Sequence, residues 1–433
     1  MTALALPPAP LAIASRKSVT HKLALALVWL TIASGAIVFS EPAPVDLLTM
    51  GLVVLLPVIG LVSISRSLVG LLALMLIATA AGVLAATNAS DLPLAMTHTG
   101  VSAYLYLSTF LFAAFVAKRP VAHTRLILNA YVWAATLAAL LGIIGYFDLL
   151  PNAYESMTRY GRASGLFKDP NVFGPFLVPA LVYALSRITG EPLRKSIHLL
   201  VLMLVIGLAM MLSFSRGAWF NMAVATSIYG VLYILTVRDN RTRLRFAVFA
   251  AMGVAALAAL VVVALQFDAV SGLASQRASL DQSYDEGPQG RFGGQQKAAG
   301  LALDNPLGLG AQQFVPHYHH EEPHNVYITM FLNAGWVGGL AFLALVGMTT
   351  IWGLRHAFVR CATQPLFLVV YGCFVANVLE GAIIDLDHWR HFYLLMALVW
   401  GLMLSASVAP ISGARPASRR PIPRRARRDR VRG

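Results

Sequence analysis

One arginine stands in a strongly apolar setting and is the first residue whose type suggests chemistry. Arg216 follows Ser213-Phe214-Ser215 in a very short break between two long apolar stretches. An arginine close to a bilayer is costly unless it pairs or reaches the lipid headgroups. It therefore either contacts lipid phosphates or binds an anionic ligand. A guanidinium beside the N-terminus of the following helix favours phosphate, so we predict an anion site at Arg216.

Three further basic residues fall in polar segments between apolar stretches. Arg162 and Lys168 lie in a glycine-containing segment that ends at Asn171, the predicted N-cap of the next helix. Arg291 lies in the largest polar stretch of the chain. Incidental surface charge is the alternative interpretation of Arg162 and Lys168. The functional interpretation adds them to one phosphate-binding surface.

A histidine-rich run ends the large polar stretch. His317, His319, His320 and His324 accompany two glutamates within eight positions. This spacing matches no common catalytic metal site, so we expect no metal here. His324 differs from the others because it directly precedes an apolar helix, where the helix dipole favours the neutral imidazole that can act as a base. Glu321 and Glu322 favour the protonated form, so the sequence does not give the direction in which the pKa of His324 shifts.

The last charged cluster lies between the final two apolar stretches. Asp385, Asp387 and Arg390 fall within six positions, beside two histidines. Asp385-Leu386-Asp387 has the form of a nucleotide–metal motif, but three residues are a weak match. We expect a network of paired charges at the membrane edge. One acidic residue of this network could orient His324 or contact a sugar hydroxyl.

The elements that must position these residues are membrane helices. Of 433 residues, 58% are hydrophobic and only 12% charged, which excludes an ordinary soluble protein. We predict an all-α, polytopic bundle of about twelve transmembrane helices with one large outer loop. The predicted spans are 23–40, 45–65, 68–87, 99–117, 126–147, 171–187, 196–215, 217–237, 246–267, 325–352, 363–384 and 391–410.

The distribution of charge sets the expected orientation. Most of the 33 Lys and Arg residues fall on the side that holds both termini, and most of the 19 acidic residues fall on the other. The positive-inside rule then places both termini in the cytoplasm. The net charge of +14 therefore reflects topology and does not imply nucleic acid. The predicted parts are the N-terminus 1–22, helices one to nine over 23–267, an outer loop 268–324, helices ten to twelve over 325–410, and a disordered arginine-rich tail 411–433.

Several motifs, taken in order along the chain, resemble the O-antigen ligase and polymerase superfamily of bacterial envelopes. Their order and their common outer side carry the resemblance more than any single motif does. The motifs are Gly161–Asn171, Ser215–Gly217, Arg291 with Asn305–Gly310, His324–Ile328 and Asn333–Gly338.

The resemblance implies an enzyme of the bacterial inner membrane with its active site in the periplasm. A glycan on undecaprenyl diphosphate would be transferred, with inversion and without metal or cofactor, to a lipid A–core or similar hydroxyl. Arg216 and Arg291 would bind the diphosphate and His324 would be the base. The expected substrate-binding residues are Arg162, Lys168, Asn325, Asp385, Asp387 and Arg390.

Two other functions stay open at this stage. A polymerase would use the same donor and site but a lipid-linked glycan as acceptor. A transporter of an anion or of a lipid-linked glycan is the second alternative. Transporters commonly show paired repeats and charges at mid-membrane, whereas here no repeat is evident and the distinctive charges lie at the outer surface.

Overall fold

The computed structural model describes residues 11–190, 193–264, 266 and 287–405. The predicted arginine-rich tail 411–433 and the segment 268–286 of the predicted loop lie outside the described residues. Within the described part the chain is almost entirely helical, which confirms the predicted fold class of a polytopic helical membrane protein.

Twelve long helices and several short elements follow one another along the described chain. The long helices are α1 (Leu11–Ala33), α2 (Pro44–Ile59), α3 (Arg66–Ala86), α4 (Leu92–Lys118), α5 (Pro120–Tyr146), α7 (Pro170–Gly190), α8 (Leu193–Leu212), α9 (Arg216–Thr236), α10 (Asn240–Ala264), α14 (Val326–Ala357), α15 (Gln364–Glu380) and α16 (Arg390–Ser405). The short elements are η1 (Ser34–Ala36), α6 (Ala153–Met157), β1 (Thr158–Arg159), β2 (Arg162–Ala163), α12 (Arg291–Asp304) and α13 (Phe314–His317).

Each predicted span overlaps one of the long helices, but the helices differ from one another in length. In the described residues, seven helices are long and apolar enough to cross a membrane: α1, α3, α4, α5, α7, α9 and α14. Four others, α2, α8, α15 and α16, are apolar but shorter. The 17 residues of α15 rise about 26 Å, a little less than a typical hydrocarbon core.

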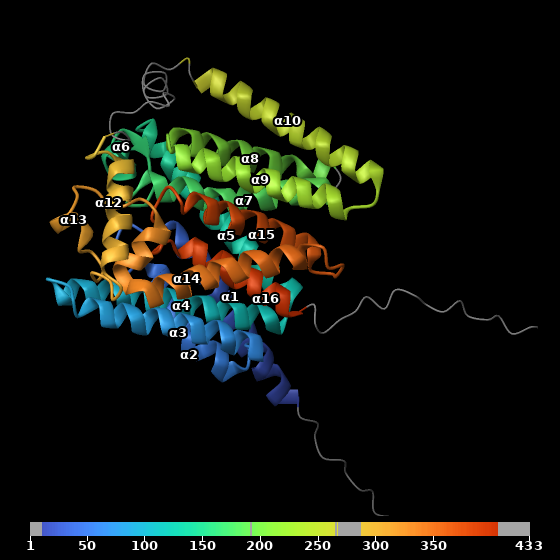
Figure 1. The fold of residues 1–433 in the computed structure, drawn as a ribbon. Helices are drawn as coiled ribbons and strands as arrows, with labels where there is room; N and C mark the ends of the chain where they lie inside the picture. Colours follow the sequence, from blue (N-terminus) through green and yellow to red (C-terminus); the bar gives the residue numbers. More distant parts are fainter. Residues whose placement is uncertain (1–10, 191–192, 265, 267–286, 406–433) are drawn as a thin grey trace, which may run out of the picture.

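The long helices form two groups with a third between them. Figure 1 shows α7, α8, α9 and α10 on one side, α2, α3 and α4 on the other, and α14, α15 and α16 in the middle. The three middle helices each pack on a different partner: α14 on α3, α15 on α9 and α16 on α4. The short elements α6, α12 and α13 lie at the same end of the bundle, which we term the loop end.

Small residues allow the middle helices to approach their partners. A Cβ added at Gly372 of α15 would lie 3.1 Å from the carbonyl oxygen of Ala225 in α9. One added at Gly401 of α16 would lie 2.6 Å from Val116 of α4. Because lipid tails are as apolar as the side chains, such close packing rather than burial from water holds membrane helices together.

A loop inserts into α14 where that helix is broken. Gly335 has φ 65° and ψ −172°, a conformation outside the helical region. The amide of Trp336 therefore donates to Pro306 O at 2.8 Å instead of to Leu332 O. Leu332 O accepts instead from the amide of Leu309, also at 2.8 Å. The loop thus supplies an acceptor for the Trp336 amide and a donor for the Leu332 carbonyl, the two groups of the missing helical hydrogen bond. Irregular backbone is tolerated inside a membrane protein when its polar groups are satisfied in this way.

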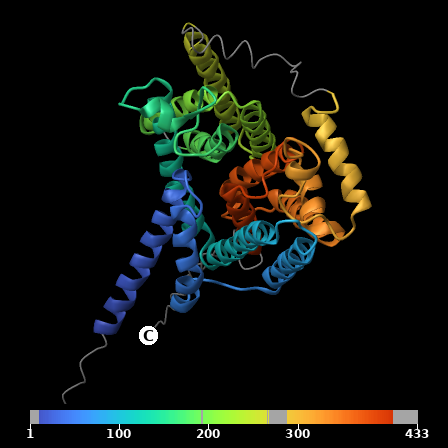
Figure 2. The same ribbon diagram turned by 90° about the vertical axis from the view of Figure 1, so that its left-hand side faces the viewer.

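The same loop fixes the position of α12. The indole Nε1 of Trp336 donates to Ala302 O in the last turn of α12 at 2.8 Å. Asn88, after α3, donates through Nδ2 to Gly308 O at 3.0 Å. α12 is thereby tied to both α14 and α3, and Figure 2 shows it along the outside of the bundle.

Candidate functional site

A cavity of about 600 Å³ lies at the loop end. Its wall comes from five segments that are far apart in the sequence. The lining residues are Arg162, Asn171, Phe214, Ser215, Arg216, Gly217, Phe220, Arg291, Phe292, Glu321, His324, Ile383 and Ile384. Four of the residues predicted from sequence, Arg162, Arg216, Arg291 and His324, therefore meet at one cavity.

Arg216 is placed by a tight turn and a helix N-terminus. It is the first residue of α9, and Ser215 caps that helix by accepting the amide of Ala218 at 3.3 Å. Phe214 has φ 46°, so the turn reverses within a few residues. The first turn of α9 leaves amides free of helical partners and carries a positive partial charge. Arg216 thus adds a full charge where the backbone already favours an anion.

Arg162 is buried and braced on both sides. Only 5% of it is exposed. Its Nε donates to Ser213 O and its Nη2 donates to Asn171 Oδ1, each at 2.7 Å. Asp169, rather than the predicted Asn171, accepts the first amide of α7, with 2.7 Å between Asp169 Oδ1 and Asn171 N. Asn171 is therefore available to hold the guanidinium of Arg162 against the cavity.

His324 is held by its backbone. Its φ of 51° is unusual for a residue other than glycine. The His324 amide donates to Asp385 Oδ2 at 2.8 Å, and its carbonyl accepts from Gln295 Nε2 at 3.1 Å. These two contacts from different segments maintain the strained conformation.

Burial is the main reason that His324 favours its neutral form. Burial lowers the pKa of His324, and the positive charge of Arg291 lowers it further. Glu321 and Asp169 act in the opposite direction, and Glu321 Oε2 lies 3.8 Å from His324 Nε2. The net direction is downward, so the imidazole is neutral and base-competent at neutral pH. The sequence alone left this sign open.

Asp385 and Asn325, predicted to bind substrate, make contacts within the protein. Asp385 accepts from the His324 amide and, through Oδ1, from the Thr329 hydroxyl at 2.6 Å. Burial, followed by the charge of Asp387, raises the pKa of Asp385 to about 7. Asn325 caps α14, its Oδ1 accepting two amides of the first turn. Both residues position His324 and its helix, and neither lines the cavity.

Three other predicted residues also lie outside the cavity wall. Lys168 pairs with Glu41 at 3.3 Å. Arg390 donates through Nε and Nη2 to the two oxygens of Asp46, each at 2.7 Å. Asp387 lies 3.6 Å from His98. The expected network of paired charges is therefore present, but its partners come from distant helices.

The histidine-rich run does not gather into a metal site in the described residues. His317 Nε2 contacts Ser90 Oγ at 2.9 Å, and His319 Nδ1 lies against the backbone of Glu321. The grouping that does have metal-like spacing within the described chain is His98, Asp387 and His388. Sequence reasoning missed His98, which lies directly before the predicted span 99–117 and some 290 positions from its partners.

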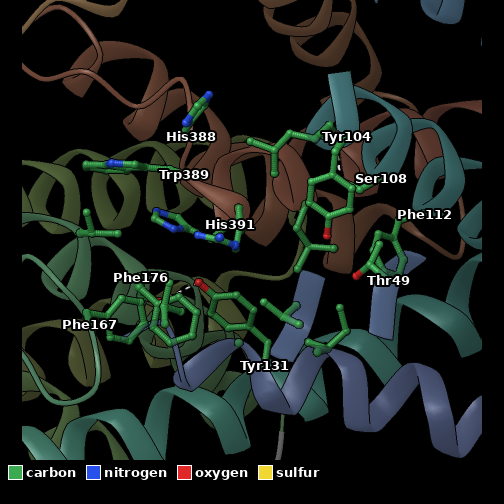
Figure 3. A pocket seen from close by; sticks show the side chains of 18 residues that line it. Thr49, Tyr104, Ser108, Phe112, Tyr131, Phe167, Phe176, His388, Trp389 and His391 are labelled. Carbon is green, nitrogen blue, oxygen red and sulfur yellow. Dashed lines mark hydrogen bonds between the residues drawn. The ribbon is translucent and has the colours of Figure 1, made fainter. Parts of the chain in front are cut away.

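A second, smaller cavity of about 70 Å³ lies among α1, α2, α4, α5, α7 and α16. Figure 3 shows its mainly aromatic wall, with His391 reaching into it and His388 at its edge. Tyr131 donates its hydroxyl to Phe176 O at 2.7 Å, which satisfies one polar group in this wall. Arg390 also lines this cavity, but its Nε and Nη2 both donate to Asp46, and the rest of the wall is mainly aromatic and aliphatic.

Comparison with known proteins finds one family model that matches part of the chain. Residues 199–343 match the family model described as O-antigen ligase. The match runs from α8 into α14 and includes Arg216, Arg291 and His324. No curated protein matched the sequence. The resemblance inferred from the motifs is confirmed over residues 199–343, where this helical membrane protein is similar to the O-antigen ligase family.

Proposed function

We propose that this protein is an O-antigen ligase that transfers a glycan from undecaprenyl diphosphate to a hydroxyl of a lipid A–core acceptor. The observation that carries the proposal is the convergence of three arginines and one neutral histidine on a single cavity. The arginines can bind an anionic leaving group, and the histidine can accept the proton of a hydroxyl nucleophile. Transfer of a glycan from a lipid diphosphate to a hydroxyl uses both.

The three arginines suit a diphosphate. Arg162, Arg216 and Arg291 come from different segments, so their charges can surround an anion rather than lie along one side of it. Guanidinium groups bind phosphate oxygens in pairs and keep their charge at any working pH. Arg162 is already held by Ser213 and Asn171, so it is placed in advance to stabilise the negative charge that builds up on the departing diphosphate. The transfer needs no metal at this cavity for that purpose.

In the proposed reaction, His324 activates the acceptor. The acceptor oxygen attacks the anomeric carbon from the side opposite the diphosphate, and the hydroxyl proton moves to His324. The bond between the anomeric carbon and the phosphate oxygen breaks, and its electron pair leaves with undecaprenyl diphosphate. The anomeric configuration is inverted. A positioned base of this kind typically accelerates a reaction about 10²–10⁴-fold.

The charge distribution supports a periplasmic site in the inner membrane. The turns joining α4 to α5, α9 to α10 and α14 to α15 lie at the end opposite the loop end (Figure 1). They carry Lys118, Arg119, Arg238, Arg241, Arg355 and Arg360. By the positive-inside rule that end faces the cytoplasm. The loop end and its cavity then face the periplasm, where undecaprenyl-linked glycans are displayed.

Deletion of the gene and complementation with variants test the proposal. Lipopolysaccharide and undecaprenyl-linked sugars are extracted from each strain. A ligase predicts long polymer stranded on the carrier and bare core at the cell surface, both restored by the wild type and not by His324→Ala. His320→Ala, which changes an exposed histidine outside the cavity, is the control and should restore both. Single repeat units on the carrier would instead identify a polymerase, and unchanged glycans would refute both.

A further inference from the structure

Two histidines and a carboxylate meet where α4 packs against the segment before α16. One potential ligand atom from each of His98, Asp387 and His388 lies within 4.8 Å of the others. His98 comes from the first turns of α4, and the other two come from the opposite end of the sequence. None of the three lines the larger cavity. We propose that His98, Asp387 and His388 bind one Zn²⁺ ion.

The spacing of these groups suits zinc. Zinc–nitrogen and zinc–oxygen bonds of about 2.0–2.2 Å in a tetrahedron hold neighbouring ligand atoms about 3.4 Å apart. The distance between His98 Nε2 and Asp387 Oδ2 is already 3.6 Å. The His98 and His388 rings are stacked with 3.9 Å between their centroids, so one ring must turn before both can direct a nitrogen at a single ion. That rotation would complete the site, with water in the fourth position.

A further hydroxyl organises the histidines. Ser102 lies one turn after His98 in α4, and its Oγ is 3.0 Å from His388 Nε2 and 3.3 Å from the carbonyl oxygen of His98. Metal-binding histidines usually have the second ring nitrogen hydrogen-bonded in this way, which fixes the tautomer. With Nε2 of His388 held by Ser102, Nδ1 is the nitrogen that faces a metal.

The charges around the cluster favour a cation. Asp387 is buried, only 8% of it being exposed. Arg390, three residues away, directs its guanidinium to Asp46. A dication at the cluster offsets negative charge that would otherwise be costly to bury.

The proposed zinc would join α4 to the segment that holds His324. Asp387 lies two residues after Asp385, whose carboxylate accepts the His324 amide. Zinc would thus brace the larger cavity from outside without touching the reacting atoms. The zinc site does not depend on the proposed function, because metal content and glycan transfer are measured separately.

Zinc content of the purified full chain tests the proposal. The protein is prepared in detergent with an affinity tag that binds no metal, incubated with zinc, desalted and analysed by mass spectrometry. We expect one zinc ion per chain in the wild type and a loss of that zinc in His98→Ala and in Asp387→Ala. The control His320→Ala changes the exposed histidine run and should keep its zinc. Retention of the zinc by His98→Ala, or its loss from His320→Ala, would overturn the proposal.

Ser102→Ala keeps the test decisive if the ligand variants fail to fold. Removal of such an outer partner typically weakens metal binding about 10–100-fold. Competition with a chromophoric zinc chelator measures that change directly. We expect Ser102→Ala to bind zinc at least about tenfold more weakly than the wild type in this competition assay. Equal affinity in the two proteins, or a wild type that holds no zinc, would refute the site.

Discussion

Gly335→Ala should release the loop that inserts into α14. The left-handed region costs a residue with a Cβ about 1–2 kcal/mol. A Cβ at this position would also lie 2.6 Å from Pro306 O and from the carbonyl carbon of Leu307. Both contacts are with backbone, so no side-chain rotation relieves them. The loop must therefore move away from the helix.

The size of the effect follows from the strain in the docked state. The hydrogen bonds from the Trp336 amide to Pro306 and from the Leu309 amide to Leu332 break on opening in both proteins, so they cancel in the comparison. The backbone strain alone destabilises the docked loop of the variant by about 1–2 kcal/mol relative to the open one. Since each 1.4 kcal/mol is a factor of ten, the open population should rise at least roughly 5–30-fold.

Native-state proteolysis measures this population. Opening of the loop frees the end of α12, so tryptic cleavage after Lys297 should accelerate by the same factor when reclosing is fast relative to cleavage. Gly347→Ala in the same helix is the matched control, because an added Cβ there meets nothing within 4 Å. It should leave the cleavage rate unchanged or lower it slightly. Equal rates for the two variants would show that the loop is not held by the break at Gly335.

Three further predictions concern the larger cavity. Transfer should fall with decreasing pH only below 6.5, because His324 must be neutral and its pKa is lowered. Glu321→Gln removes a charge that raises this pKa, so it should shift the acid limb of kcat/KM to still lower pH. An upward shift of that limb would contradict the assignment of His324 as the base. Arg162→Lys cannot keep both charged hydrogen bonds that Arg162 makes, and each typically contributes about 1.5–3 kcal/mol. The affinity for undecaprenyl diphosphate should therefore drop roughly 10–150-fold. The affinity of Lys168→Ala should stay near that of the wild type. Asp385→Ala leaves the His324 amide without its hydrogen-bond acceptor, which costs about 1–3 kcal/mol. Turnover should therefore fall about 5–150-fold while donor affinity persists, and Asp385→Asn should retain more of the turnover. An equal loss of donor affinity would place Asp385 in the donor site.

Much of the helical framework could be predicted because apolar runs are bounded by charge. The expected span 217–237 differs by one residue at each end from α9. The start of α5 was less accurate, since its first turn holds His123 and Arg125 and does not read as apolar. The break in α14 was not predicted. Glycine in an apolar helix commonly serves close packing, and its sequence context does not reveal the loop that docks there.

The candidate site likewise contains residues that the sequence indicates and contacts that it does not. Arg216 and His324 stand out in the sequence because a charged or basic group at the edge of an apolar run is costly without a ligand. Their supporting contacts carry no such signal. Arg390 pairs with Asp46 across 344 positions, and the role of Asp385 depends on the backbone of His324 rather than on any side chain. Pairings of this kind depend on the tertiary fold, which no local periodicity encodes.

A cavity whose wall spans residues 162 to 384 also constrains how the protein is made. Its arginines are synthesised early and enter the membrane without the residues that complete the wall. The carboxylate that holds the His324 amide follows 61 positions later. Until Asp385 has left the ribosome and the segment before α16 has docked, the arginines can attract a lipid diphosphate but the base is not positioned. The nascent chain would therefore acquire an affinity for its donor before it acquires the capacity to consume it.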